Sequence, residues 1–291
     1  DITDDTNKCN AFFFEVLTGS AYNDTLQGRG DADTIFGGAG DDSIRARGGD
    51  DTVDAGAGND LIEGNEGNDQ LSGGDGNDTF NGGTGNDSLT GGAGDDTATF
   101  TGPVTDYSFD YLPGGGLQVT DTVPGRDGTD TLTQVEYVTF GGTTYRLVTG
   151  DDGSNTTLQG PAGEPALIIA HDGNDWGGGH ATSDAIFGGA GNDTLDGGDG
   201  NDTLVGEDDD DLLRGDGGNE AIFGGTGNDT LKGGSGDDTL TGGDGADFFD
   251  LIEAGGGDTI TDFDMDLTGG LTTDQLDVSA LQNSDGSPVR S

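Results

Sequence analysis

Residues 73–90 read GGDGNDTFNGGTGNDSLT, two nine-residue units in which glycines, an aspartate and an apolar residue recur at fixed places. The same period runs without a slip over residues 19–99, giving nine units, and a second set of nine occupies residues 170–250. Across the eighteen units the sixth position is Asp in seventeen and Glu220 in the other, while the eighth is apolar everywhere except at Gly177. A register kept this strictly indicates stacked repeats rather than an ordinary globular core.

Each unit combines a turn with a short strand. Position one is Gly in fifteen units and position four in fourteen, which predicts turn positions where the backbone takes φ > 0. The following triplet, such as Thr79, Phe80 and Asn81, alternates polar and apolar residues and therefore predicts a strand with one face buried. Two units complete one coil, so alternate units place their turns on opposite edges. The pattern predicts an all-β fold of two parallel β-rolls, a form of β-solenoid, joined by a small β-meander.

The apolar residues at position eight form the predicted core. This core is thin, because each unit contributes one side chain to it. Its members are Leu26, Ile35, Ile44, Val53, Ile62, Leu71, Phe80 and Leu89 in the first array, and Ile186, Leu195, Leu204, Leu213, Ile222, Leu231, Leu240 and Phe249 in the second.

The acids at position six form four ladders, two per array, and are the predicted metal ligands. Stacked coils lie about 4.8 Å apart, so neighbouring carboxylates repel by about 3.5 kcal/mol at an effective dielectric of about 20. Divalent ions would remove this repulsion, and Ca²⁺ accepts six to eight oxygen ligands in a flexible geometry. The ladders are Asp24, Asp42, Asp60, Asp78 and Asp96; Asp33, Asp51, Asp69 and Asp87; Asp175, Asp193, Asp211, Asp229 and Asp247; and Asp184, Asp202, Glu220 and Asp238.

In these units the sequence resembles the RTX, or repeats-in-toxin, family of calcium-binding nonapeptides, whose pattern is G-G-x-G-x-D-x-U-x. The resemblance implies calcium-loaded rolls in which an ion lies between turns two repeats apart. It also implies that each ion takes carbonyl oxygens from positions two and four of one turn and from positions one and three of the other. One such site combines Gly38, Gly40 and Asp42 with Ala55, Ala57 and Asp60; the further carbonyls are those of Gly56, Gly58, Gly74, Gly76, Gly83, Gly85, Gly189, Gly191, Gly198, Gly200, Gly225 and Gly227.

Some sites depart from the pattern. Glu220 is one methylene longer than the other members of its ladder, and Asp31, Thr182 and Asp209 replace the glycine at position four. We expect weaker sites at these turns.

The arrays divide the chain into five predicted parts. Between them the nine-residue period is lost, and strand-like stretches such as residues 107–111 and 134–140 predict the meander, with Asp127 to Asp130 in a turn. The parts are an N-terminal cap (1–18, with Phe12 to Phe14), the first β-roll (19–99), a meander that connects and caps (100–169), the second β-roll (170–250) and a C-terminal capping segment (251–291). In the last of these, Asp262, Asp264 and Asp277 are candidates for one further ion.

Composition restricts the partners. The chain has a formal charge of -49, which excludes nucleic acid as a partner because the phosphates would be repelled. No apolar run approaches the roughly 20 residues that span a bilayer, so membrane insertion is not expected. The single cysteine, Cys9, cannot form an internal disulfide, and the first residues lack a secretory signal pattern.

Catalytic candidates are few. His171 and His180 are the only histidines, both at position two of adjacent units and therefore expected on opposite edges. No zinc-protease, nucleophile-elbow or phosphate-loop motif occurs. The sequence therefore predicts that these residues form no enzyme, while a catalytic domain elsewhere in a longer protein stays open.

The predicted function is that of a calcium-binding structural module of a secreted or cell-surface bacterial protein, which folds on binding extracellular calcium. The RTX resemblance further implies type I secretion. A second interpretation is an adhesive or surface-layer module that binds glycan or self-associates. A third is the export and stability tail of a larger secreted hydrolase.

Overall fold

The computed structural model describes residues 16–112, 115–155, 157–251, 256–263 and 274–277. In this part of the chain every regular element is a β-strand except one short 3₁₀ helix, η1 (Val104–Asp106). Two compact units are present, Asp1–Thr144 and Tyr145–Ser291, and each is described by itself. Most of the predicted N-terminal cap, with Phe12 to Phe14 and Cys9, lies outside the described residues, as does Asp264.

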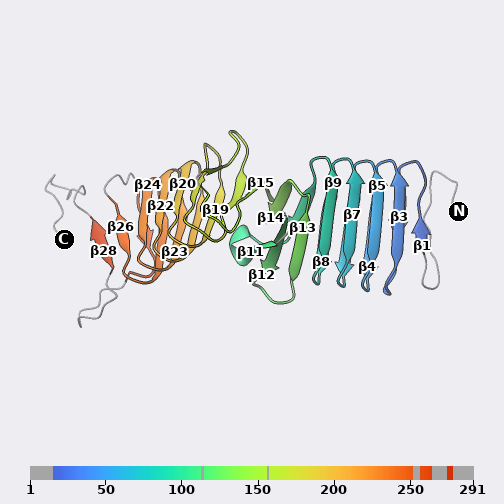
Figure 1. Ribbon diagram of the computed structural model, residues 1–291, viewed down its shortest axis with the longest axis horizontal. Helices are drawn as coiled ribbons and strands as arrows, with labels where there is room; N and C mark the ends of the chain where they lie inside the picture. Colours follow the sequence, from blue (N-terminus) through green and yellow to red (C-terminus); the bar gives the residue numbers. More distant parts are fainter. Residues whose placement is uncertain (1–15, 113–114, 156, 252–255, 264–273, 278–291) are drawn as a thin grey trace. The chain divides into compact units, whose positions relative to one another are not determined.

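The first unit is a roll with two parallel faces (Figure 1). One face is formed by β1 (Val16–Thr18), β3 (Thr34–Ala39), β5 (Thr52–Ala57), β7 (Gln70–Asp75), β9 (Ser88–Ala93) and β13 (Thr129–Thr133). The other is formed by β2 (Thr25–Gln27), β4 (Ser43–Gly48), β6 (Leu61–Glu66), β8 (Thr79–Thr84), β10 (Thr97–Phe100) and β14 (Tyr137–Phe140). From β1 to β10, strands next to each other on a face are therefore two repeats apart in the sequence, whereas β13 and β14 follow β9 and β10 after a longer interval.

The register confirms the eighteen-residue coil. Thr34 pairs with Thr52 and Ile35 with Val53 in the parallel ladder between β3 and β5. The all-β fold of parallel coils is confirmed.

An antiparallel hairpin extends the first face. It consists of β11 (Tyr107–Leu112) and β12 (Gly116–Asp121), and β12 pairs with β13 in turn. The Tyr107 ring packs against Phe100 and Phe140, with ring centroids 5.5 and 4.7 Å away. The hairpin thereby adds buried apolar side chains, Tyr107, Leu117 and Val119, after the last repeat of the first roll.

The second unit repeats the two-faced arrangement. One face contains β15 (Thr143–Thr149), whose first residues precede the division, then β17 (Ala166–Ile169), β19 (Ala185–Ala190), β21 (Thr203–Asp208), β23 (Ala221–Thr226), β25 (Thr239–Asp244) and β27 (Thr259–Ile260). The other contains β16 (Leu158–Gln159), β18 (Trp176–Gly178), β20 (Thr194–Asp199), β22 (Leu212–Gly217), β24 (Thr230–Ser235), β26 (Phe248–Asp250) and β28 (Gln275–Asp277).

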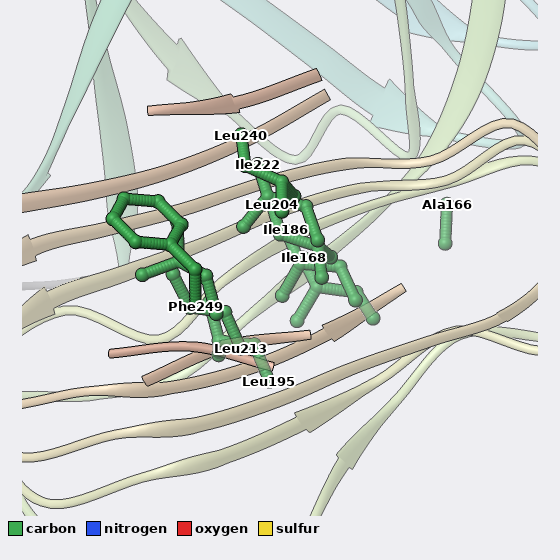
Figure 2. Packing of buried hydrophobic residues seen from close by; sticks show 10 residues of the cluster. Ala166, Ile168, Ile186, Leu195, Leu204, Leu213, Ile222, Leu240 and Phe249 are labelled. Carbon is green, nitrogen blue, oxygen red and sulfur yellow. The ribbon is translucent and has the colours of Figure 1, made fainter. Parts of the chain in front are cut away.

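Position eight forms the core of each roll, as predicted. Every predicted core residue is at most 2% exposed. In the second roll Figure 2 shows Ile186, Leu204 and Ile222 in one row, opposite Leu195 and Leu213 from the other face. Each position-eight residue follows the acid of its own turn by two residues, so a core with a regular spacing also spaces the acids regularly.

Candidate metal-binding ladders

The position-six acids form ladders that hold successive coils together. One carboxylate oxygen, Oδ1, accepts the backbone N–H of the position-six residue in the preceding coil. Asp60 N–H donates to Asp78 Oδ1 and Asp78 N–H to Asp96 Oδ1, both at 2.8 Å. The equivalent bonds recur at Asp42, Asp51, Asp60, Asp69, Asp87, Asp193, Asp202, Asp211, Asp229, Asp238 and Asp247.

The second oxygen of these acids is buried and has no hydrogen-bond donor among the described residues. Asp78, for example, is 1% exposed, and its Oδ2 has no partner. Burying an ionised oxygen without a partner is costly. The acids that share this feature are Asp42, Asp51, Asp60, Asp69, Asp78, Asp87, Asp96, Asp175, Asp193, Asp202, Asp211, Asp229, Asp238 and Asp247, together with both oxygens of Glu220.

Position-one glycines open a space in front of these oxygens. A Cβ built on Gly37 would lie 2.5 Å from Asp42 Oδ2 and 2.4 Å from the carbonyl oxygen of Ala55 in the next coil. A carboxylate oxygen and a carbonyl oxygen from successive coils therefore converge on one point. The shared calcium site of Asp42 and the turn that begins at Ala55 stays a prediction.

The predicted reason for the position-one glycines was wrong. Gly37 does not adopt a positive φ; the positive values are at positions two and four, with φ +116° at Gly38 and +100° at Gly40. Position one keeps glycine because a side chain there would fill the space in front of the carboxylate. Positions two and four keep it because L-residues rarely adopt this backbone conformation.

Without a cation, the surroundings of the ladder acids oppose the ionisation of their carboxyl groups. Burial, together with repulsion from the neighbouring ladder acids, raises the pKa of Asp51 and Asp193 to about 7. Burial also raises the pKa of Asp211 to about 8, again with Asp193 and Asp229 contributing. A cation placed between the acids would reverse both effects.

The donor set matches a hard cation. No group of three His, Cys, Asp or Glu side chains converges within the described ranges, so each position offers few carboxylates, and backbone carbonyls such as that of Ala55 are the further oxygens beside them. Such all-oxygen sets suit Ca²⁺, whereas Zn²⁺ prefers nitrogen and sulfur ligands.

Three ladder acids differ from the rest. The second oxygens of Asp24, Asp33 and Asp184 accept backbone N–H groups from Ser20, Arg29 and His180, at position two of their own turns. None of these position-two residues has the positive φ seen in the other turns, so their N–H groups point to the carboxylate. We expect these sites, at the ends of their ladders, to bind a cation less tightly.

The ladders continue beyond the repeats that the sequence pattern identified. Asp130 and Glu136 accept the N–H groups of Asp87 and Asp96, at 2.8 and 2.9 Å. Asp258 and Asp274 do the same for Asp238 and Asp247, at 3.3 and 3.0 Å. A strict nine-residue count misses these acids, but the pattern of an acid followed two residues later by an apolar residue would have found all four.

Other candidates contact the backbone. Asp262 accepts the N–H groups of Gly242 and Gly243 with its two carboxylate oxygens, and its binding of a further ion stays a prediction. His171 has a φ of +71°, as other position-two residues do. The His180 backbone N–H donates to Asp184.

The repeats match a known family model. The RTX calcium-binding nonapeptide repeat model matches residues 13–44, 37–71, 45–80, 72–99, 178–213 and 214–249, which together cover more than half of the chain. The chain belongs to the RTX family. Its repeats accordingly bind calcium, with several ions along the arrays. RTX repeats are structural elements, and nothing in the described residues conflicts with the prediction that this chain is not an enzyme.

Two further comparisons add little. No curated protein matches the sequence. The crystal structure of the extracellular lipase LipA from Serratia marcescens is similar at 20% identity and a TM-score of 0.29, over 85% of this chain and 41% of the lipase. This chain thus spans less than half of the lipase, and a likeness of this degree carries no argument. Among the described residues, no helix has the length and apolar character needed to cross a membrane.

Proposed function

We propose that this RTX chain is a structural module of a secreted or cell-surface protein, and that it folds when it meets extracellular calcium. The position-six acids and the predicted backbone carbonyls are the proposed calcium ligands. We also propose that the chain is organised in the five parts predicted from its sequence. The observation that supports it is the series of buried carboxylate oxygens without a donor.

Without cations, the buried acids of the ladders oppose folding of the roll. Its acids are buried in rows, and the pKa of Glu220 rises to about 8 because burial and the nearby Asp238 both oppose its charge. The apolar core offers one side chain per repeat, worth about 1.5 to 3 kcal/mol each, against about 1 to 2 kcal/mol of backbone entropy for each ordered residue. Bound cations must therefore supply part of the folding free energy.

The dependence on calcium would restrict folding to the outside of the cell. Extracellular calcium-binding modules work at dissociation constants of about 10⁻⁴ to 10⁻³ M, far above cytosolic calcium. The chain would thus stay unfolded inside the cell and fold outside it. Export through a type I system, which accepts unfolded chains, fits this order of events.

Circular dichroism and small-angle scattering of the full chain test the proposal. Spectra are compared in chelator, in calcium, in magnesium, and in sodium chloride at matched ionic strength, because screening alone weakens repulsion between exposed charges. We expect a compact strand-rich chain in calcium alone. A chain equally folded in chelator, or equally restored by magnesium or sodium chloride, would falsify the proposal.

A further inference from the structure

A tenth repeat is hidden in the segment that follows the first array. Residues 125–133 read GRDGTDTLT, with Gly at positions one and four, Asp130 at position six and Leu132 at position eight. The family model does not extend over these residues. They are out of phase because residues 100–124, which include the β11–β12 hairpin, come between the ninth unit and this one.

The structure places this unit as the next coil of the roll. Leu132 pairs with Leu89 in a parallel ladder, as Leu89 pairs with Leu71 one coil earlier. The Asp87 N–H donates to Asp130 Oδ1 at 2.8 Å, although the two residues are 43 apart instead of 18.

The second half of this turn repeats the geometry of its predecessors, whereas the first half differs: Gly125 at position one has a φ of +78°, and Arg126 at position two does not have a positive φ. Gly128 has a φ of +95°, and a Cβ on it would lie 1.8 Å from the Gly85 carbonyl oxygen. The Thr129 N–H donates to Asn86 Oδ1 at 3.0 Å, as the Asn86 N–H does to Asn68 Oδ1.

We infer that this turn and the turn of Asp87 enclose a calcium site, which the hairpin needs in order to dock on the roll. The inference rests on the proposed function and adds a site that a nine-residue count does not give. Asp87 is 3% exposed and its Oδ2 has no hydrogen-bond donor. Asp130, which continues its ladder, is 2% exposed.

No basic side chain neutralises this pair among the ion pairs of the described residues. The nearest arginine in the sequence, Arg126, binds Asp106 and Asp121 instead, at 2.8 and 2.6 Å. A divalent cation is therefore the group that the two acids lack.

The same turn anchors the hairpin. The Asp127 carboxylate accepts the Thr101 N–H and hydroxyl, at 2.8 and 2.9 Å, and also the Tyr107 hydroxyl. Arg126 lies over the Tyr107 ring, with its guanidinium carbon 5.0 Å from the ring centroid. A cation that fixes Asp130 thereby fixes the neighbouring residues that hold the first strand of the hairpin.

The test uses the full chain and the variant Asp130→Asn. Asparagine keeps the oxygen that accepts the Asp87 N–H but removes the charge. We expect calorimetry to count one calcium ion fewer. We also expect amide hydrogen exchange in residues 107–121 to become at least about tenfold faster in saturating calcium, while β19 to β25 keep their protection; tenfold corresponds to about 1.4 kcal/mol.

Two control variants locate the effect. Asp110→Asn makes the same charge change at an exposed position of the hairpin and should change neither readout. Asp69→Asn removes an acid one coil further from the hairpin and should lower the ion count without deprotecting residues 107–121.

The inference is overturned if Asp130→Asn keeps the wild-type ion count and protection, or if Asp69→Asn deprotects the hairpin equally. Loss of protection in β19 to β25 as well would show general unfolding and would also overturn a local site. Failure of the proposed function has another signature: the wild-type chain itself would bind no calcium.

Discussion

Replacing Asp78 by asparagine should change stability in opposite directions with and without calcium. Asp78 is 1% exposed; its Oδ1 accepts the Asp60 N–H and its Oδ2 has no donor. Asparagine preserves the first contact and removes the charge. Without calcium that charge opposes folding, whereas with calcium its proposed role is that of a ligand.

The magnitudes follow from the surroundings of the carboxylate. Burial, followed by repulsion from Asp60 and Asp96, raises the pKa of Asp78 from 3.8 to about 6. At about pH 8 its ionised form therefore costs the calcium-free roll on the order of 3 kcal/mol, which Asp78→Asn would remove. In saturating calcium the variant leaves bound ions short of a charged ligand, and losing one partner of a buried ion pair costs about 3 to 5 kcal/mol.

Two titrations at about pH 8 measure the change in stability caused by Asp78→Asn, one with calcium and one without it. Urea unfolding followed by circular dichroism gives the stability in calcium, and folding by trimethylamine N-oxide in chelator gives the stability without it. The control is Asp75→Asn, the same charge change at an exposed position of the same turn, which should shift either value by less than about 0.5 kcal/mol. The reasoning would be refuted if Asp78→Asn changed stability in the same direction with and without calcium, or if Asp75→Asn changed it as much as Asp78→Asn.

Three further predictions concern pH, backbone and core. Because burial raises the pKa of acids such as Asp211 from 3.8 to about 8, the calcium-free roll should lose stability as pH rises from about 4 to about 8, while calcium affinity should increase as competing protons leave; calorimetry at stepped pH measures both. Gly76→Ala should lower the melting temperature in calcium, since its φ is +129° and the new Cβ would lie 1.9 Å from the Gly58 carbonyl oxygen; an unchanged melt would contradict this. Leu231→Ala, at a fully buried position, should cost about 2 to 5 kcal/mol by urea titration, whereas Leu61→Ala, 43% exposed, should cost about 0.5 kcal/mol or less.

Much of this fold follows from the sequence because one short pattern is repeated. The apolar residue at position eight can be buried only if every coil has the same length, so Ile35 and Val53 must lie side by side, as they do. The acid at position six then falls at the same turn in each coil. Fold, core and ladders are thus consequences of a single period.

What the sequence did not reveal depends on contacts between coils. The reason for glycine at Gly37 is the neighbouring Asp42 carboxylate and the Ala55 carbonyl of the next coil, which no single repeat contains. Asp130 escaped prediction because an inserted hairpin shifts the phase while the spatial register is kept. Counting nine-residue periods finds only acids at regular intervals along the chain, whereas the ladders are formed by acids that are neighbours in the folded structure.

The ladders also explain why aspartate is preferred to glutamate at position six. Aspartate is short enough for one oxygen to accept the N–H of the preceding coil while the other faces the space beside position one. Glu220 does not do both: its own N–H donates to Asp238 Oδ1 at 3.0 Å, but both of its carboxylate oxygens lack a donor, so the Asp202 N–H is not held by it. The added methylene places one oxygen beside Gly218 and the other beside Gly215. Joining the coils and offering an oxygen to a cation are thus tasks of one side chain, and only aspartate has the length for both.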